Sequence, residues 1–157
     1  MNQSLLLLAK IENNQYEAEN NINLTEVVKK YLHLFGEIIR DKQLSVESDL
    51  SLEFNVKLHP FLADSLVSNL IGNAVKYNVE NGRIKIETST DEICISNTSK
   101  VAAIGEKLLF QRFGTSNDNK ESSTGLGLAI VKKIADANGL EIAYRFNEGL
   151  HQFCVRN

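Results

Sequence analysis

Residues 124–133 read Thr-Gly-Leu-Gly-Leu-Ala-Ile-Val-Lys-Lys and follow a largely polar segment, residues 111–123. Gly125 and Gly127 favour a tight turn, and the apolar residues after them recur at helical spacing. The pattern predicts a polar loop that ends where an amphipathic helix begins. The first N–H groups of a helix have no partner inside it, so this helix start is a candidate phosphate site. A glycine-rich helix start can also serve close packing alone.

A second candidate segment, residues 68–78, reads Ser-Asn-Leu-Ile-Gly-Asn-Ala-Val-Lys-Tyr-Asn. At helical spacing, one face carries Asn69, Asn73, Lys76 and Tyr77. An asparagine carbonyl is a hard oxygen ligand suited to Mg²⁺, and a lysine supplies a positive charge for phosphate. The stripe therefore favours a site for a divalent metal and a polyphosphate. The alternative is a helix whose asparagines satisfy neighbouring loops.

Together these segments resemble the ATP-binding catalytic domain of sensor histidine kinases, in the superfamily that includes gyrase, Hsp90 and MutL. Residues 69–77 are similar to the asparagine box of that family, and residues 109–113 to its phenylalanine box. Residues 123–131 are similar to its second glycine box. The three motifs occur in the family's order, and the resemblance covers nearly the whole chain.

The resemblance implies an α/β fold, a two-layer sandwich in which helices cover one face of a mixed, mainly antiparallel sheet (the Bergerat-type ATP-binding fold). It implies two parts, the tail of a dimerisation and phosphoacceptor helical hairpin in residues 1–18 and the catalytic domain in residues 19–157. The residue pattern agrees with this fold class. It predicts helices over residues 3–18, 25–39, 59–78, 106–110 and 124–138, with Thr25 as an N-cap. It predicts strands over residues 22–24, 44–46, 52–56, 84–86, 93–95, 141–144 and 152–155.

The resemblance also implies roles in binding ATP and Mg²⁺. Asn73 is the expected Mg²⁺ ligand, and Asn69 supports the phosphate region. Lys76 and Arg112 are expected at the phosphates, and Tyr77 beside the ribose and base.

The second glycine box is expected to hold phosphate oxygens through the backbone around Thr124, Gly125 and Gly127. Leu126 and Leu128 lie beside these positions, although Leu128 suits the core equally well. Two aromatic residues flank the polar loop: Phe110 is expected to plug its base, and Phe113 either does the same or contacts nucleotide.

Asn69 helps to choose between branches of the superfamily. ATP-hydrolysing members carry a glutamate there as a general base, and a neutral amide cannot accept that proton. A histidine imidazole is already nucleophilic when neutral, so a kinase does not need this base. Asn69 therefore favours a histidine kinase over a self-standing ATPase or serine kinase of the same superfamily.

The first glycine box departs from the family pattern of Asp-x-Gly-x-Gly, because residues 97–101 read Asn-Thr-Ser-Lys-Val. Asn97 can accept a hydrogen bond from the adenine amino group without charge assistance, which weakens binding by roughly 1 kcal/mol. Ser99 and Val101 replace glycines, as Ser123 does in the second box. These changes motivate an alternative, a degenerate, non-catalytic nucleotide-binding or regulatory module of a sensor protein.

None of the three histidines, His33, His59 and His151, lies in the sequence context of a phosphoacceptor. His59 precedes Pro60 and suits packing or capping at a helix start. The chain is therefore expected to be the catalytic part of a longer protein. The implied partners are the helical hairpin domain of the same protein and the receiver domain of a response regulator. The implied location is the cytoplasmic side of a membrane-anchored sensor.

Composition limits the alternatives. The chain has 157 residues and a net charge of −3, and it lacks the basic runs of a nucleic-acid-binding surface. No apolar run is long enough to span a bilayer, so direct membrane contact by this segment is not expected. Cys94 and Cys154 lie far apart in apolar stretches and are expected to be buried free thiols in a reducing compartment, with no disulfide or metal role.

Overall fold

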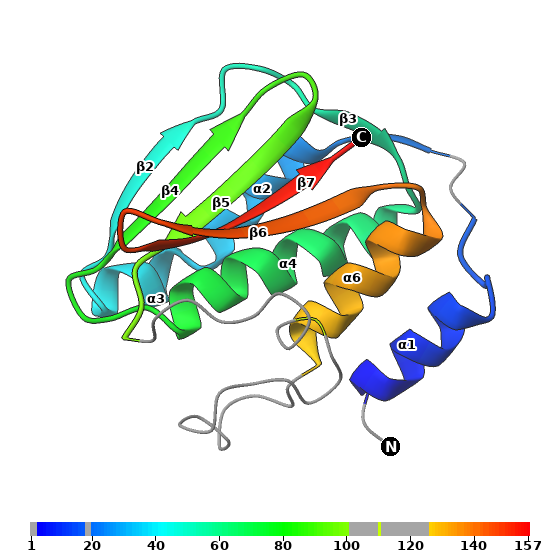
Figure 1. The fold of residues 1–157 in the computed structure, drawn as a ribbon, viewed down its shortest axis with the longest axis horizontal. Coiled ribbons are helices and arrows are strands. Elements are labelled where there is room, and N and C mark those ends of the chain that lie inside the picture. Colours follow the sequence, from blue (N-terminus) through cyan, green and yellow to red (C-terminus); the bar gives the residue numbers. More distant parts are fainter. Residues whose placement is uncertain (1–2, 18–19, 101–109, 111–125) are drawn as a thin grey trace.

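The computed structural model describes residues 3–17, 20–100, 110 and 126–157. Its main element is a five-stranded sheet in the order β2–β4–β5–β7–β6 (Figure 1). The β2–β4 pair is parallel, and the other three pairs are antiparallel. The strands are β2 (Ser45–Asp49), β4 (Arg83–Thr88), β5 (Glu92–Asn97), β6 (Glu141–Asn147) and β7 (Leu150–Arg156).

Helices cover one face of this sheet, as Figure 1 shows. This layer contains α2 (Leu24–Leu34), α4 (Pro60–Lys76) and α6 (Gly127–Ala137). The short helix α3 (Gly36–Asp41) follows α2. The N-terminal helix α1 (Gln3–Glu12) lies beside α6, where Glu12 and Lys133 form an ion pair of 3.6 Å. The arrangement confirms the predicted two-layer α/β sandwich.

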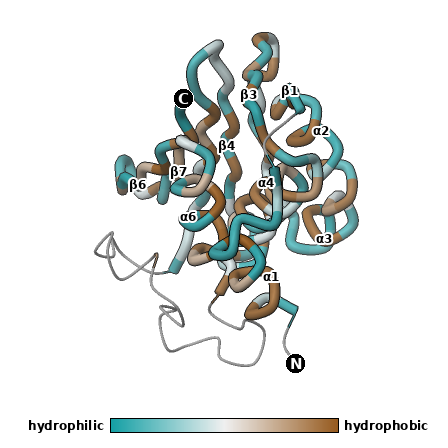
Figure 2. Tube along the Cα trace, turned by 90° about the vertical axis from the view of Figure 1, so that its right-hand side faces the viewer, coloured by the Kyte–Doolittle hydropathy of each residue, from teal (hydrophilic) through white to brown (hydrophobic). Residues whose placement is uncertain are grey.

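The core lies between the two layers and follows from period-two alternation in the strands. In β4 and β5, the side chains of Ile84, Ile86, Ile93 and Ile95 face the helices and are buried. Figure 2 shows hydrophobic segments recurring along the strands and helices where the layers meet. Burying one such side chain stabilises the fold by about 1.5–3 kcal/mol.

The N-terminal region differs from the sequence prediction at two points. The first helix ends at Glu12 rather than residue 18, and Asn14 has a positive φ of 55° that a helix cannot continue. The prediction of Thr25 as an N-cap is wrong, because Asn23 caps α2 by accepting from the Glu26 N–H at 3.4 Å. Thr25 is buried instead, and its hydroxyl donates to the Leu52 carbonyl at 3.0 Å.

Two predicted elements are shorter than expected. The helix predicted over residues 25–39 is divided at Phe35 into α2 and α3. The strand predicted over residues 52–56 is reduced to β3 (Asn55–Lys57), which pairs with β1 (Asn21–Asn23) in a separate two-stranded sheet. Alternation alone could not reveal this, because it does not say which strand a segment pairs with.

Both ends of α4 are held by side chains. Pro60 occupies the first turn, and the Phe61 N–H donates to His59 Nδ1 at 3.0 Å, which agrees with the capping role expected for His59. At the other end, Lys42 Nζ donates to the carbonyls of Val75 and Lys76, each at 3.0 Å. A lysine at this position satisfies terminal carbonyls and complements the helix dipole.

The two cysteines contradict the prediction of free thiols. Cys94 in β5 and Cys154 in β7 are direct cross-strand partners, with Cα atoms 4.1 Å apart, and they form a disulfide. The prediction failed because a separation of 60 residues in sequence conceals adjacency in a sheet. In the part of the chain that the structure describes, no helix is both long and apolar enough to cross a bilayer.

Candidate functional site

The two motif segments, far apart in sequence, meet where the start of α6 lies against α4. A methyl group in place of the Gly127 hydrogen would lie 3.0 Å from Asn69 Oδ1 and 3.7 Å from Asn73 Oδ1. The glycine therefore lets the α6 backbone approach both amide oxygens. The structure thus brings together Asn69, Asn73 and Gly127 from the two motif segments.

The first turn of α6 suits an anion. Among the described residues, the N-cap Leu126 makes no side-chain cap hydrogen bond, and the first turn contains no acidic residue. Its unpaired N–H groups and the positive end of the helix dipole favour a negatively charged group. Thr124 and Gly125, also predicted here, lie outside the described residues.

Asn69 has a fixed orientation. Its Nδ2 donates to the Ser65 carbonyl at 2.6 Å, so the amide oxygen is directed to the α6 side. Asn69 and Asn73 are both half-buried, which leaves them accessible to a ligand. Two amide oxygens beside a helix start are a donor set suited to a hard cation with phosphate.

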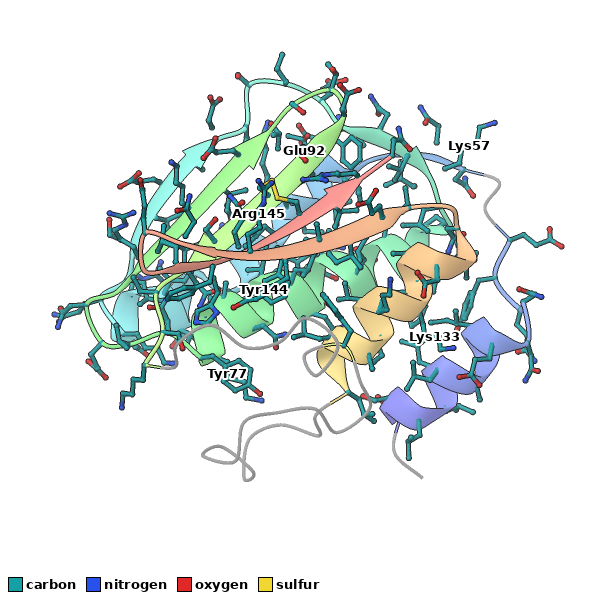
Figure 3. All side chains as sticks on the ribbon, in the orientation of Figure 1. Lys57, Tyr77, Glu92, Lys133, Tyr144 and Arg145 are labelled. Atoms are coloured by element: carbon teal, nitrogen blue, oxygen red, sulfur yellow. A yellow bond between two sulfur atoms is a disulfide. The ribbon has the colours of Figure 1, made fainter. Side chains whose placement is uncertain are left out.

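Lys76 and Tyr77 lie at the C-terminal end of α4, where Figure 3 shows Tyr77. Partial burial lowers the pKa of the Lys76 ammonium below its ordinary value of 10.5, through the loss of hydration. The Tyr77 hydroxyl is buried and has no hydrogen-bond partner among the described residues. Because a buried hydroxyl is costly to leave unpaired, this atom fits a ligand that completes it.

Asn97 ends β5 on the sheet face that the helices cover. It is buried, and its Nδ2 donates to the Thr98 carbonyl at 2.9 Å. Across the strands it lies opposite His151, which is also buried and whose Nδ1 is 2.7 Å from the Tyr144 hydroxyl. The position of His151 opposite Asn97 depends on strand register.

Asn78 is a positioning residue that the sequence analysis missed. Its Nδ2 donates to the carbonyls of Ala74 and Arg83, each at 3.0 Å, and its Oδ1 accepts from the Thr98 hydroxyl at 2.6 Å. The buried amide ties the end of α4 to β4 and to the residue after β5. The available signal in the sequence was that Asn78 ends the motif segment 68–78, directly after Tyr77.

The remaining predicted residues fall into two groups. Leu126 is fully buried in the core and Leu128 is packed against it, so Leu126 could reach a ligand only through its backbone. Phe110 contacts Phe153 edge-to-face with ring centroids 6.1 Å apart. Arg112 and Phe113 lie outside the described residues, as do residues 106–109 of the helix predicted over residues 106–110.

Within the described ranges, one group of three metal-ligating His, Cys, Asp or Glu side chains occurs, Glu92 with Cys94 and Cys154. It lies away from the asparagines, and its two sulfurs are already bonded to one another. The described His, Cys, Asp and Glu side chains therefore form no group of three ligands beside Asn73.

Comparison with known proteins gives a consistent result. The sequence profile of the family described as "Histidine kinase-, DNA gyrase B-, and HSP90-like ATPase" matches residues 60–154, from α4 to β7. The heme sensor protein HssS of Staphylococcus saprophyticus is 30% identical over 140 residues, which are 85% of this chain and 30% of the relative. The signal transduction histidine-protein kinase ArlS of Staphylococcus aureus is 28% identical, over 94% of this chain and 35% of the relative. The chain thus spans about a third of the length of these relatives.

Solved structures agree on the fold. The catalytic domain of histidine kinase ThkA superposes with a TM-score of 0.67 at 28% identity, over 87% of this chain and 94% of that one. The mycobacterial sensor histidine kinase MprB superposes with a TM-score of 0.73 at 21% identity, over 87% and 95% of the two chains.

Proposed function

The chain belongs to the histidine kinase-, DNA gyrase B- and HSP90-like ATPase family, and we propose that it binds Mg-ATP and transfers the terminal phosphoryl group to a histidine on an adjoining helical domain. Its relatives support a two-component kinase catalytic domain. The observation that carries the proposal is the approach of the Gly127 backbone to Asn69 and Asn73. It joins a metal-ligating amide to a helix start that can bind phosphate.

Each residue has a separate task in this proposal. Asn73 Oδ1 would hold Mg²⁺, which neutralises phosphate charge when bound. The α6 N–H groups would hold phosphate oxygens, and Lys76 would contribute a positive charge. Arg112, Thr124 and Gly125 are proposed at the phosphates by family resemblance alone.

The base and ribose would lie between Asn97 and Tyr77. The orphaned Tyr77 hydroxyl supports a polar ligand atom at this place. Phe113, Leu126 and Leu128 are proposed to border the same site, with Leu126 acting through its backbone.

In the transfer step, a neutral imidazole nitrogen of the acceptor histidine attacks the γ-phosphorus as the bond to the ADP oxygen breaks. The acceptor ring then loses its N–H proton to solvent, and phosphohistidine and ADP remain. Asn69 cannot act as a general base for water, since an amide does not accept a proton at neutral pH. We therefore propose slow hydrolysis of ATP by this domain alone.

The partners are part of the proposal as well. Residues 1–18 would be the tail of the dimerisation and phosphoacceptor hairpin, and a response regulator receiver domain would take the phosphate from the histidine. The domain would work at the cytoplasmic side of a membrane-anchored sensor. The match to about a third of each relative leaves room for these other parts.

The test joins the chain to its natural helical hairpin and supplies labelled Mg-ATP. We expect acid-labile, base-stable label on the hairpin, reduced at least about a hundredfold in Asn73→Ala. Lys85→Gln, an exposed lysine of the sheet, is the matched control and should leave labelling unchanged. Absence of phosphohistidine in a protein that binds Mg-ATP would disprove phosphotransfer while leaving nucleotide binding intact.

A second function, a non-catalytic regulatory module, is motivated by the base end of the site. The Asn97 amide is neutral, so its Oδ1 would accept from the adenine amino group without charge assistance. Calorimetry with ADP and a non-hydrolysable ATP analogue separates the two functions. No binding at millimolar nucleotide would favour the regulatory module, whereas Mg²⁺-dependent binding that weakens in Lys76→Ala would favour the kinase.

A further inference from the structure

The Cys94–Cys154 disulfide lies on the sheet face opposite the helices. Residues on that face form a row across four strands, since Glu87 pairs with Cys94, Cys94 with Cys154, and Cys154 with Ala143. Figure 3 shows the sulfur–sulfur bond between the labelled side chains of Glu92 and Arg145. The bond is therefore on the opposite side of the sheet from the candidate nucleotide site.

The two sulfurs differ in their access to solvent. Cys154 is 0% exposed, whereas Cys94 is 8% exposed and lines a surface cavity of about 300 Å³. Arg145, Gln152, Thr88 and Ser89 also line this cavity. A small molecule that enters the cavity meets Cys94 rather than Cys154.

Arg145 is the cation among the residues that line the cavity, and it can pair with the carboxylate of a small molecule, whereas the Glu92 carboxylate lies within 4.8 Å of both sulfurs. Two glutamates reach the cavity, but Glu92 is paired with Arg156 at 2.7 Å and Glu87 with Lys85 at 3.0 Å. In the described part of the chain, Arg145 takes part in no ion pair. An arginine is suited to a carboxylate through paired N–H donors, and it also stabilises a thiolate nearby.

We propose that Cys94–Cys154 is a reversible redox site, at which a small carboxylate-bearing thiol exchanges through this cavity and attacks Cys94. The incoming thiolate forms a bond to Cys94 Sγ, and the Cys94–Cys154 bond breaks to release Cys154 as a thiolate. A second thiol then attacks the mixed disulfide and releases Cys94. Two thiols are thereby oxidised to one small disulfide, and the protein disulfide is reduced to two thiols.

The position of the bond connects it to the candidate nucleotide site. Along the same pair of strands, three residues from the disulfide, Asn97 lies opposite His151 on the helix-covered face. The covalent link holds the β5–β7 register at which these two side chains meet. A change of nucleotide affinity on reduction is thus expected, and this part rests on the proposed function.

Glutathione is the probe for the exchange. In Cys154→Ser, oxidised glutathione should add one glutathionyl group to Cys94, which intact mass and peptide mapping detect. In Cys94→Ser, addition to the enclosed Cys154 should be at least roughly tenfold slower. Equal rates in the two variants, or opening of the native disulfide only after denaturation, would overturn the proposal.

Arg145→Gln tests the cation in the cavity. It should slow the reaction of oxidised native protein with reduced glutathione roughly fivefold, as expected for the loss of one near-surface charge interaction. Lys57→Gln, an exposed lysine of β3, is the matched control. A reaction slowed equally by both substitutions would overturn the role of Arg145.

Nucleotide titrations of the oxidised and reduced protein complete the test. A difference of about threefold or more in affinity supports the link through β5 and β7. Equal nucleotide affinities of the oxidised and reduced protein would overturn the link between the disulfide and the nucleotide site. Mass spectrometry would still test the thiol–disulfide exchange at Cys94. If neither form binds nucleotide, the proposed function fails and the exchange is judged on its own measurement.

Discussion

The two faces of the five-stranded sheet are stabilised in different ways. The covered face places Ile86, Ile95 and Val155 against helices, all nearly without solvent exposure. The open face carries the disulfide and two ion pairs, the exposed Lys85–Glu87 and the partly exposed Arg156–Glu92. Alternation along the same strands produces both faces.

The two faces therefore contribute to stability through different interactions. Apolar burial on the covered face is distributed over many side chains, and Asn97 ends β5 on the same face. On the open face, one covalent bond carries more stabilisation than the surface ion pairs, each worth about 0–1 kcal/mol. Substitutions of similar size should therefore have unequal effects on the two faces.

The largest effect is expected in the covered core. Ile95→Ala, at a side chain that is 2% exposed, should reduce the free energy of unfolding by about 2–5 kcal/mol, through lost burial and a cavity. Chemical denaturation measures this. Gln152→Ala, across the strands on the open face, is the control and should change stability by less than about 0.5 kcal/mol. Equal losses would contradict the distinction between the faces.

Reduction of Cys94–Cys154 should have the next largest effect. Opening a bond between residues 60 apart should lower the free energy of unfolding by about 2–4 kcal/mol, mainly because the unfolded chain gains freedom. Denaturation with and without reductant measures the change. The control is the double variant Cys94→Ala with Cys154→Ala, whose free energy of unfolding should be the same with and without reductant. An unchanged midpoint in the native protein would show that the open face does not depend on the bond.

Gly127→Ala, in the helix layer on the covered face, should weaken nucleotide binding. The added methyl group would lie 3.0 Å from Asn69 Oδ1, so Asn69 must shift and nucleotide affinity should fall about tenfold. Calorimetry measures this, with Gly36→Ala as the control because its methyl group would meet only the flexible end of Arg40. Undiminished affinity would remove Gly127 from the proposed site.

Arg156→Gln tests the ion pairs of the open face. Arg156 Nε lies 2.7 Å from Glu92, and Nη1 lies 3.8 Å from Glu141. With these side chains partly exposed, the substitution should cost about 0.5–1 kcal/mol of unfolding free energy and less at high salt. A salt-independent loss of several kcal/mol would show that this face depends on charge far more than its exposure indicates.

The smallest effect concerns Lys30 and Asp64, which join α2 to α4 at 3.2 Å. A hydrogen bond and the charge of Asp64 raise the pKa of Lys30 above its ordinary 10.5. The Lys30–Asp64 ion pair therefore contributes fully to stability below pH 10.5, and this contribution is lost as the pH rises through the higher folded-state pKa of Lys30. The difference in free energy of unfolding between native protein and Lys30→Gln should decrease only above pH 10.5, and denaturation experiments across the alkaline pH range measure it. If this difference disappears nearer neutral pH, a group other than Lys30 is responsible for it.

The sequence predicted those features that depend on local periodicity. The helical spacing of Asn69 and Asn73 placed them on one face of α4, and the turn at Glu148 and Gly149, both with positive φ, separates the two closing strands. The fold class followed from the order of such elements. The roles of Asn69 and Gly127 at the phosphates were expectations from family resemblance and remain predictions, and the structure adds that α6 packs against α4 with Gly127 next to Asn69.

The errors arose where strand pairing decides the structure. Cys94 and Cys154 became neighbours, and His151 came opposite Asn97, only because β7 pairs with β5 in one register. Thr25 is not the cap because α2 begins one residue earlier with Asn23 as its N-cap, and the Thr25 hydroxyl instead donates to the distant Leu52 carbonyl. Neither relation leaves a periodic signal in the sequence.

The strand order also bears on the order of synthesis. β7 follows every other strand in the chain and yet lies between β5 and β6. On the ribosome, β2, β4 and β5 can pair with one another early, whereas β6 waits without a neighbour until residues 150–156 emerge. Asn97 would therefore gain its cross-strand neighbour His151 last of all, and a nascent chain should remain a substrate for chaperones until then.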